Sequence, residues 1–143
     1  MTLRFGEAIR PDIRYKTRPG VYVILPLGDQ ILLTHQASPR PEFQLPGGGI
    51  DKGEQPVAAL HREVMEETGW TIGTPIKLGV YRRFCFMPEY DLWAEKVCHI
   101  YLARPVRRLC DPLEAGHTAV WMPKVQAEQV IASEGDRAFV ASL

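Results

Sequence analysis

Residues 48–70 read GGIDKGEQPVAALHREVMEETGW, and this stretch determines the fold and the chemistry that we expect. Glu63, Glu66 and Glu67 stand at positions i, i+3 and i+4, so on a helix they lie on one face within an arc of about 100°. Glutamates at this spacing repel each other in an empty helix, and a divalent cation reverses that effect. Because carboxylate oxygens are ligands for hard ions, the pattern predicts Mg²⁺ or Mn²⁺ rather than Zn²⁺.

The same stretch contains signals for both ends of a helix. Gly53 or Glu54 is suited to the start, and Pro56 is tolerated in the first turn. Gly69 suits the position just past the last turn, where a left-handed conformation is common. We therefore expect a helix over residues 55–68.

The apolar residues of this helix predict how it packs. Val57, Leu60 and Val64 project beside the acidic arc and form a stripe that can dock on a sheet. Ala59 falls within the acidic arc, where its small side chain is expected to leave room for a metal ion and a substrate.

With these residues in place, the stretch resembles the Nudix box of the Nudix (MutT-like) hydrolases, which cleave a nucleoside diphosphate linked to another moiety. The resemblance is carried by seven spaced positions: Gly48, Glu54, Arg62, Glu63, Glu66, Glu67 and Gly69. It implies an α/β (α+β) fold, namely an α/β/α sandwich in which helices flank a mixed β-sheet. It also implies metal-assisted hydrolysis of a phosphoanhydride, in which the cation neutralises phosphate charge and supplies a bound water.

The resemblance implies roles for individual residues. Glu63, Glu66 and Glu67 would bind the metal, and the backbone carbonyl of Gly47 or Gly48 would complete its coordination. The catalytic group as a whole would comprise Glu63, Glu66, Glu67, Arg62, Glu54 and Glu114. Within it, Arg62 would pair with Glu54 or Glu63 and orient them.

A general base outside the box is also expected from the resemblance. Glu114 precedes Trp121-Met122-Pro123, which is similar to the Trp-Val-Pro segment of family members, so we rank Glu114 first. Three other loop acids remain open: Glu89, Asp91 and Glu95.

Composition agrees with one globular domain spanning residues 1–143. The 17 basic and 17 acidic residues balance, which argues against a stable nucleic-acid partner or a basic membrane contact. The N-terminal residues show no signal-peptide pattern. The three cysteines lack metal-site spacing and favour a cytoplasmic location, with Cys85 and Cys98 expected in the core. A homodimer is compatible with the resemblance.

Hydrophobic patterning places the remaining elements. Residues 20–26 and 31–35 are expected to pair as a hairpin around a turn at 27–30. Further strands are expected at 77–86, 97–103 and 119–122, with a long loop over 87–96. The tail from Val125 has helical spacing and a break at Gly135.

Several residues outside the box are candidates for substrate contacts. Arginine suits phosphate binding, and loop aromatics suit stacking on a base. The candidates are Arg18, Arg40, Arg82, Arg83, Tyr90 and Trp93. Arg82 and Arg83 alternate across a strand, so one of them at most faces a given side. No histidine shows metal-site spacing, and none is assigned to a metal.

The substrate stays open among nucleotide classes. Pro88 lies where the resemblance favours ADP-ribose, whereas the size of the chain suits a nucleoside triphosphatase equally. Leu32-Leu33-Thr34 matches a fragment of the coenzyme A hydrolase motif, but His35 stands where an arginine is expected. An alternative function is a nucleotide-binding regulator that keeps the fold without turnover.

Overall fold

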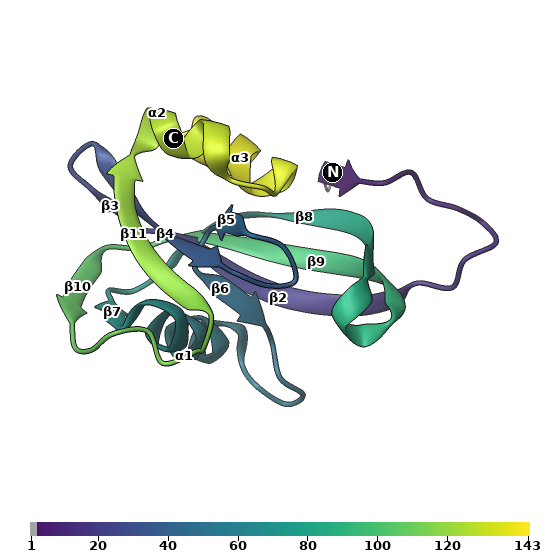
Figure 1. The fold of residues 1–143 in the computed structure, drawn as a ribbon, viewed down its shortest axis with the longest axis horizontal. Helices are drawn as coiled ribbons and strands as arrows, with labels where there is room; N and C mark the ends of the chain where they lie inside the picture. Colours follow the sequence, from purple (N-terminus) through teal and green to yellow (C-terminus); the bar gives the residue numbers. More distant parts are fainter. Residues whose placement is uncertain (1–2) are drawn as a thin grey trace.

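A computed structural model describes residues 3–143, and its strands form a layer between helices on two sides (Figure 1). The largest sheet contains, in spatial order, β1 (Leu3–Gly6), β8 (Ile76–Met87), β9 (Leu92–Leu102), β2 (Lys16–Ile24) and β6 (Gly47–Gly49). Its β1–β8 and β2–β9 pairs are parallel, and its other pairs are antiparallel. The sheet is therefore mixed, as predicted.

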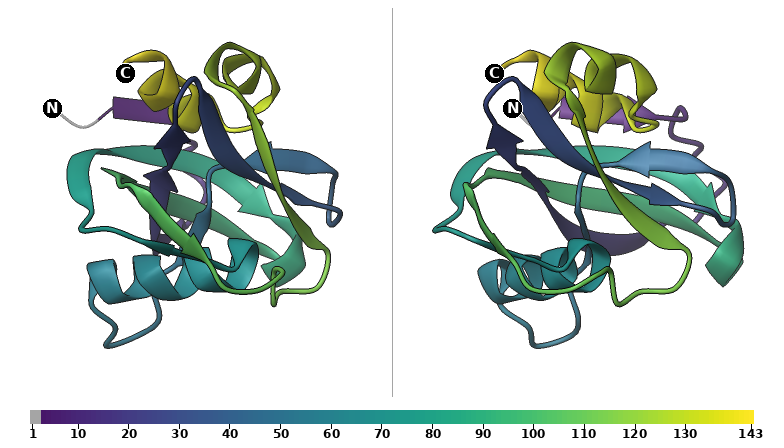
Figure 2. Two further views of the ribbon diagram at one scale, coloured as in Figure 1. Left: turned by 90° about the vertical axis from the view of Figure 1, so that its left-hand side faces the viewer. Right: turned by 60° about the vertical axis from the view of Figure 1, so that its left-hand side comes forward.

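The remaining strands form smaller sheets beside this one. One contains β11 (His117–Pro123), β4 (Gln30–Gln36) and β3 (Pro26–Leu27), with β5 (Glu42–Gln44) also paired to β4. The other pairs β10 (Pro105–Arg108) with β7 (Trp70–Ile72). Helix α1 (Pro56–Thr68) covers one side, and α2 (Lys124–Val130) and α3 (Glu134–Ala141) cover the other (Figure 2). This arrangement confirms the predicted sandwich of helices around a mixed sheet.

The predicted hairpin of residues 20–26 and 31–35 is wrong in its pairing. Residues 20–24 lie in β2, which pairs with β9 and β6 of the main sheet. Within residues 20–27, only β3 pairs with β4, so the chain changes sheets at the fully buried Leu25. A strand that is hydrophobic on both faces suits the centre of a sheet better than a two-stranded hairpin, which explains the difference.

The predicted loop at 87–96 is much shorter. A 3₁₀ turn, η1 (Pro88–Tyr90), is followed by Asp91 with φ 49°, and β9 begins at Leu92. The polar residues that suggested a loop alternate with inward-facing residues such as Ala94, which is fully buried. Trp93 consequently lies in a strand, with its ring centroid 5.3 Å from that of Phe86.

Helix α1 begins one residue later than predicted, after Gln55, and Gly69 adopts φ 75° at its end as expected. Leu60 and Val64 are fully buried against the sheet, as predicted. Val57 is 42% exposed, so its assignment to the buried stripe is wrong. Ala59 is also fully buried, in the apolar core under α1. The prediction that Ala59 leaves room for a metal ion and a substrate is therefore wrong.

The C-terminal tail is helical, but its break lies at residues 131–133 rather than at Gly135. Ser133 caps α3, since its Oγ accepts a hydrogen bond from the Asp136 amide at 3.4 Å. Gly135 lies inside α3, and a Cβ there would approach the Tyr81 ring to 2.4 Å. The glycine therefore permits close packing rather than ending the helix. Over the described residues 3–143, helices of the length and hydrophobicity needed to span a membrane are absent.

Candidate functional site

The acidic face of α1 lies against β6. The Gly47 amide donates a hydrogen bond of 2.9 Å to Glu67 Oε1, and Glu67 is only 5% exposed. A Cβ at Gly48 would lie 2.5 Å from Glu63 Oε2, so the absence of a side chain there makes room for that carboxylate. The glycines thus allow the strand backbone to approach the helix closely.

Arg62 joins the carboxylates of this region into one network. Its guanidinium donates to both oxygens of Glu54, at 2.7 and 2.8 Å. The same side chain donates to Glu63 Oε1 at 3.1 Å, to Glu66 Oε1 at 3.2 Å and to the Gly49 carbonyl at 3.3 Å. The predicted pairing of Arg62 is therefore present with both Glu54 and Glu63. These bonds hold the pKa of Glu54 down to about 2, first through Arg62 and then through the Asp51 amide.

The carboxyl groups of Glu67 and Glu63 have raised pKa values, in contrast to Glu54. Burial raises the pKa of Glu67 to about 9, the Gly47 hydrogen bond acts against this, and the charges of neighbouring glutamates add to it. Burial also raises the pKa of Glu63, partly offset by Arg62. Carboxylates that are buried together without enough positive charge are costly in their ionised form. A bound cation would remove that cost.

Glu114 reaches the same place from a distant part of the chain. The amides of Leu113 and Glu114 donate to the Glu66 carbonyl at 2.7 and 3.0 Å, which fixes this loop to the end of α1. One ligand atom each from Glu63, Glu66 and Glu114 lies within 4.8 Å of the others. The structure thus brings together five of the six predicted catalytic side chains directly, while Glu54 joins them through Arg62.

His117 is the residue that sequence reasoning missed. Its Nε2 lies 3.5 Å from Glu67 Oε2, and its Nδ1 lies 3.9 Å from Glu114 Oε2. Glu67, Glu114 and His117 form a second group whose ligand atoms lie within 4.8 Å. His117 is the first residue of β11, and only the pairing of β11 with β4 places it here. No local spacing in the sequence could have revealed it.

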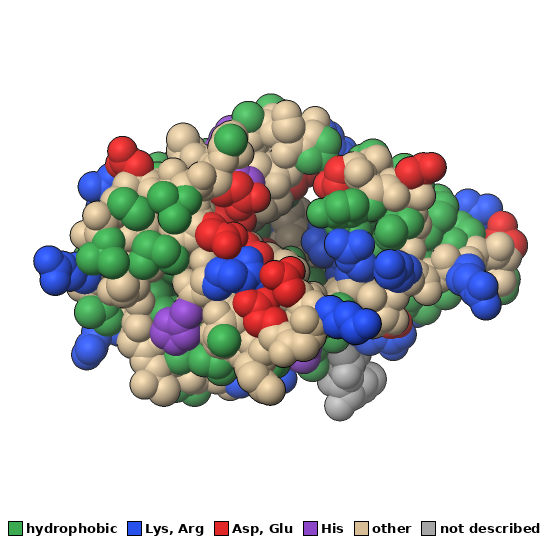
Figure 3. All heavy atoms as spheres, turned by 90° about the horizontal axis from the view of Figure 1, so that it is seen from below, with side chains coloured by type: hydrophobic (Ala, Val, Ile, Leu, Met, Phe, Trp, Pro, Cys, Tyr) green, Lys and Arg blue, Asp and Glu red, His purple; other side chains and the backbone are tan. Residues whose placement is uncertain are grey.

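A cavity of about 1000 Å³ opens beside these carboxylates. Acidic side chains gather on one side of a hollow and basic ones gather across it (Figure 3). Three basic residues line the cavity: Arg40, Arg83 and Lys96. Cys85 lines the cavity too, whereas Cys98 is buried in the core. The prediction that both cysteines lie in the core is therefore confirmed for Cys98 and wrong for Cys85.

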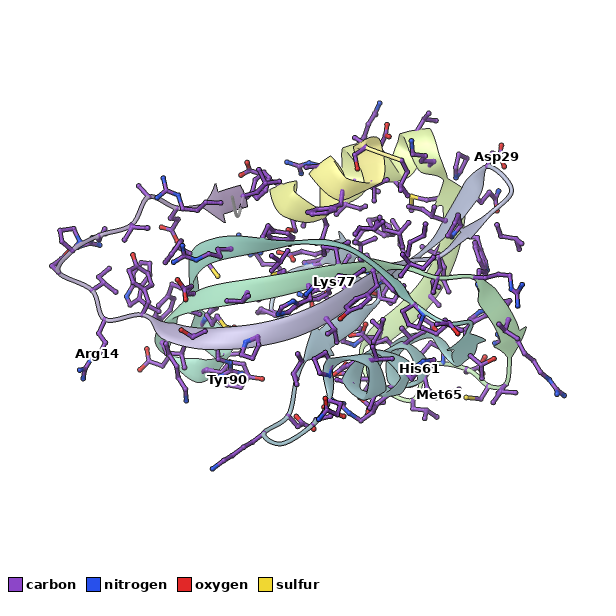
Figure 4. All side chains as sticks on the ribbon, turned by 180° about the vertical axis from the view of Figure 1, so that it is seen from behind. Arg14, Asp29, His61, Met65, Lys77 and Tyr90 are labelled. Atoms are coloured by element: carbon purple, nitrogen blue, oxygen red, sulfur yellow. The ribbon has the colours of Figure 1, made fainter. Side chains whose placement is uncertain are left out.

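The other substrate candidates fall on both sides of the sheet. Tyr90 lines the cavity and extends from η1 at the far end of the β8–β9 hairpin (Figure 4). The Arg18 guanidinium carbon lies 4.5 Å from the centroid of the Tyr90 ring. Arg82 does not line the cavity and pairs with Glu95, so the prediction that Arg82 and Arg83 face opposite sides is confirmed. Trp93 does not line the cavity either.

Comparisons with known proteins agree with this arrangement. A sequence model of the NUDIX domain matches residues 16–143. A NUDIX hydrolase from Nitrosomonas europaea superposes with a TM-score of 0.72 at 20% identity, covering 89% of each chain. The chain therefore belongs to the NUDIX domain family.

Two curated relatives are similar over shorter stretches. A Bacillus subtilis protein named as a candidate 8-oxo-dGTP diphosphatase is 38% identical over 74 residues, covering 52% of this chain and 50% of the relative. A Helicobacter pylori RNA pyrophosphohydrolase is 39% identical over 59 residues, covering 38% of each. The chain thus matches half or less of the length of these relatives.

Proposed function

We propose that this protein is a Mg²⁺- or Mn²⁺-dependent pyrophosphohydrolase that cleaves a phosphoanhydride bond in a nucleoside diphosphate linked to another moiety. The observation that carries the proposal is the pair of overlapping ligand groups around Glu114, with ligand atoms within 4.8 Å of one another beside the large cavity. Family membership and the names of both curated relatives support it.

The donor atoms fit a hard divalent ion. Glu63, Glu66, Glu67 and Glu114 offer carboxylate oxygens, and the Gly47 or Gly48 carbonyl can add another. His117 contributes a single nitrogen in one of the two groups, so oxygen ligands predominate. When bound, the ion would neutralise phosphate charge and activate a water.

The remaining residues would support these ligands. Arg62 holds Glu63 and Glu66 in place through its own bidentate contact with Glu54. Glu114 has a 46% exposed side chain and can accept a proton from the attacking water. His117 contacts both Glu67 and Glu114, so it can orient these two carboxylates. We also propose that residues 1–143 act as one domain in the cytoplasm.

A nucleotide panel tests this function. Nucleoside triphosphates, an oxidised deoxynucleoside triphosphate, ADP-ribose and 5′-triphosphorylated RNA are incubated with Mg²⁺ or Mn²⁺, and the products are identified by mass. We expect release of phosphate, pyrophosphate or a nucleoside monophosphate that EDTA abolishes. Glu66→Gln should lose this turnover, while Glu128→Gln, whose partner is Lys124 on α2, should retain it. Ligand-induced stabilisation without any product would instead favour a nucleotide-binding regulator.

A further inference from the structure

Two basic side chains face each other on the floor of the cavity. Arg83 of β8 and Lys96 of β9 are register partners in the antiparallel pair, and both line the cavity. Residues directly opposite in such a pair have Cβ atoms about 4.5–5.5 Å apart, and like charges at this spacing are destabilising. This arrangement therefore carries a cost in the free energy of folding unless an anion offsets it.

The structure provides no direct counter-charge for this pair. Within residues 3–143, neither Arg83 nor Lys96 forms an ion pair or a side-chain hydrogen bond. The neighbouring Arg82 differs, because it pairs with Glu95 across the same two strands. Lys96 and Arg83 influence the buried carboxyl of Asp136, where they act against the rise in pKa that burial causes. Asp136 already accepts a hydrogen bond of 2.7 Å from the Tyr81 hydroxyl, and one carboxyl cannot balance two cations.

The basic pair lies across the cavity from the carboxylates. In the main sheet, only β2 separates β9 from β6, whose glycines contact the acidic face of α1. Adjacent strands are about 4.8 Å apart, so roughly 10 Å separates β9 from β6. Because lysine and arginine side chains are long, their charged ends can lie much closer to the carboxylates than the strand backbones do. A ligand bound at the carboxylates through a cation can therefore extend across Tyr22 of β2 toward Arg83 and Lys96.

We infer that Arg83 and Lys96 form a second anion subsite, which binds phosphate beyond the diphosphate held at the carboxylates. This inference rests on the proposed function and defines its substrate class: nucleotides with three or more consecutive phosphates, rather than nucleoside diphosphate sugars. Arginine binds phosphate through two parallel hydrogen bonds, and lysine adds a point charge. A sugar in the same place would leave both cations facing neutral hydroxyls.

Binding of two inorganic probes tests the subsite. Tripolyphosphate and pyrophosphate are titrated calorimetrically into the protein with Ca²⁺, and the probes are checked for hydrolysis afterwards. We expect the wild type to bind tripolyphosphate about tenfold or more tighter than pyrophosphate, since contacts to charged groups are strong. In the double variant R83Q/K96Q this preference should disappear, while pyrophosphate binding remains. Arg82→Gln is the matched control on the opposite face and should keep the preference.

The preference of the variants for tripolyphosphate over pyrophosphate decides whether Arg83 and Lys96 form the subsite. A double variant that keeps the preference for tripolyphosphate to within about twofold of wild type contradicts the subsite. If the double variant does not fold, the single variants R83Q and K96Q should each weaken the preference, whereas Arg83→Lys should keep it in part because the charge remains. Failure of the proposed function has a different signature, because the wild type would then select tripolyphosphate without hydrolysing any nucleotide of the panel.

Discussion

Gly47 and Glu67 are joined by a hydrogen bond of 2.9 Å from the backbone amide to Oε1, which links β6 to α1 beneath the acidic cluster. The second oxygen of Glu67 lies 3.5 Å from His117 Nε2. The Glu67 carboxyl is therefore held from both sides while being almost completely buried. Because burial raises the pKa of this carboxyl, we expect the ionisation of Glu67 to depend on a bound cation.

The metal-free protein should lose stability as the pH rises. The pKa of Glu67 is raised from 4.5 to about 9 in the folded state, so the folded protein retains a proton that the unfolded chain releases. The contribution of Glu67 to stability is complete below 4.5 and is lost progressively as the pH rises to about 9. Chemical denaturation in EDTA across this range measures the effect.

Glu67→Gln serves as the comparison, because glutamine keeps an acceptor for the Gly47 amide and does not ionise. Its free energy of unfolding in EDTA should fall less steeply with pH than that of the wild type. Added Mn²⁺ should stabilise the wild type increasingly as the pH rises, since binding displaces the proton. Parallel pH profiles for the two proteins would show that Glu67 is not the titrating group.

Gly48→Ala should impair activity through a steric effect on Glu63. The new Cβ would lie 2.5 Å from Glu63 Oε2, so the carboxylate must move away from its position. Gly49→Ala is the matched control, because its Cβ would meet no atom within 4 Å. We expect a drop in kcat/KM of about tenfold or more for Gly48→Ala and little change for Gly49→Ala. Equal activities would place Glu63 outside the reaction.

Arg62→Lys should reduce turnover although the positive charge is kept. A lysine cannot contact both oxygens of Glu54 while also reaching Glu63 and Glu66. Loss of such orienting contacts typically costs about 10–100-fold in metal affinity or activity. Arg108→Lys, at an exposed ion pair with Asp111, is the control and should be close to wild type. Steady-state kinetics at several Mg²⁺ concentrations separate the loss of metal affinity from the loss of kcat.

The spacing of residues 48–70 predicts much of the site because most contacts there are local to α1. The bonds from Arg62 to Glu54, Glu63 and Glu66 span eight residues at most. Helical spacing alone does not determine which side of α1 faces the sheet, and for this reason Val57 and Ala59 were misplaced. The approach of Glu114 and His117 to α1 depends on the β11–β4 register and on the Glu66 carbonyl. The spacing within residues 48–70 carries no sign of these contacts, so Glu114 was expected only from the family resemblance and His117 was not expected at all.

Gly135→Ala should destabilise the protein without changing its chemistry. A Cβ at Gly135 would lie 2.4 Å from the Tyr81 ring, whose hydroxyl contacts Ser133 and Asp136 at 2.7 Å. Overpacking of this kind costs about 1–3 kcal/mol. Gly73→Ala, with its nearest neighbours at 3.8 Å, should unfold like the wild type in the same urea titration. An unchanged midpoint for Gly135→Ala would mean that α3 shifts freely on the sheet.

Mn²⁺ binding, followed by electron paramagnetic resonance, tests the central claim that this acidic cluster holds a catalytic cation. The free Mn²⁺ signal is recorded while the ion is titrated into the metal-free wild type, the double variant E63Q/E67Q and the control Glu128→Gln. We predict that the wild type and the control remove Mn²⁺ from solution and that E63Q/E67Q does not, with loss of nucleotide hydrolysis in parallel. Equal Mn²⁺ binding by E63Q/E67Q and the wild type would contradict the account.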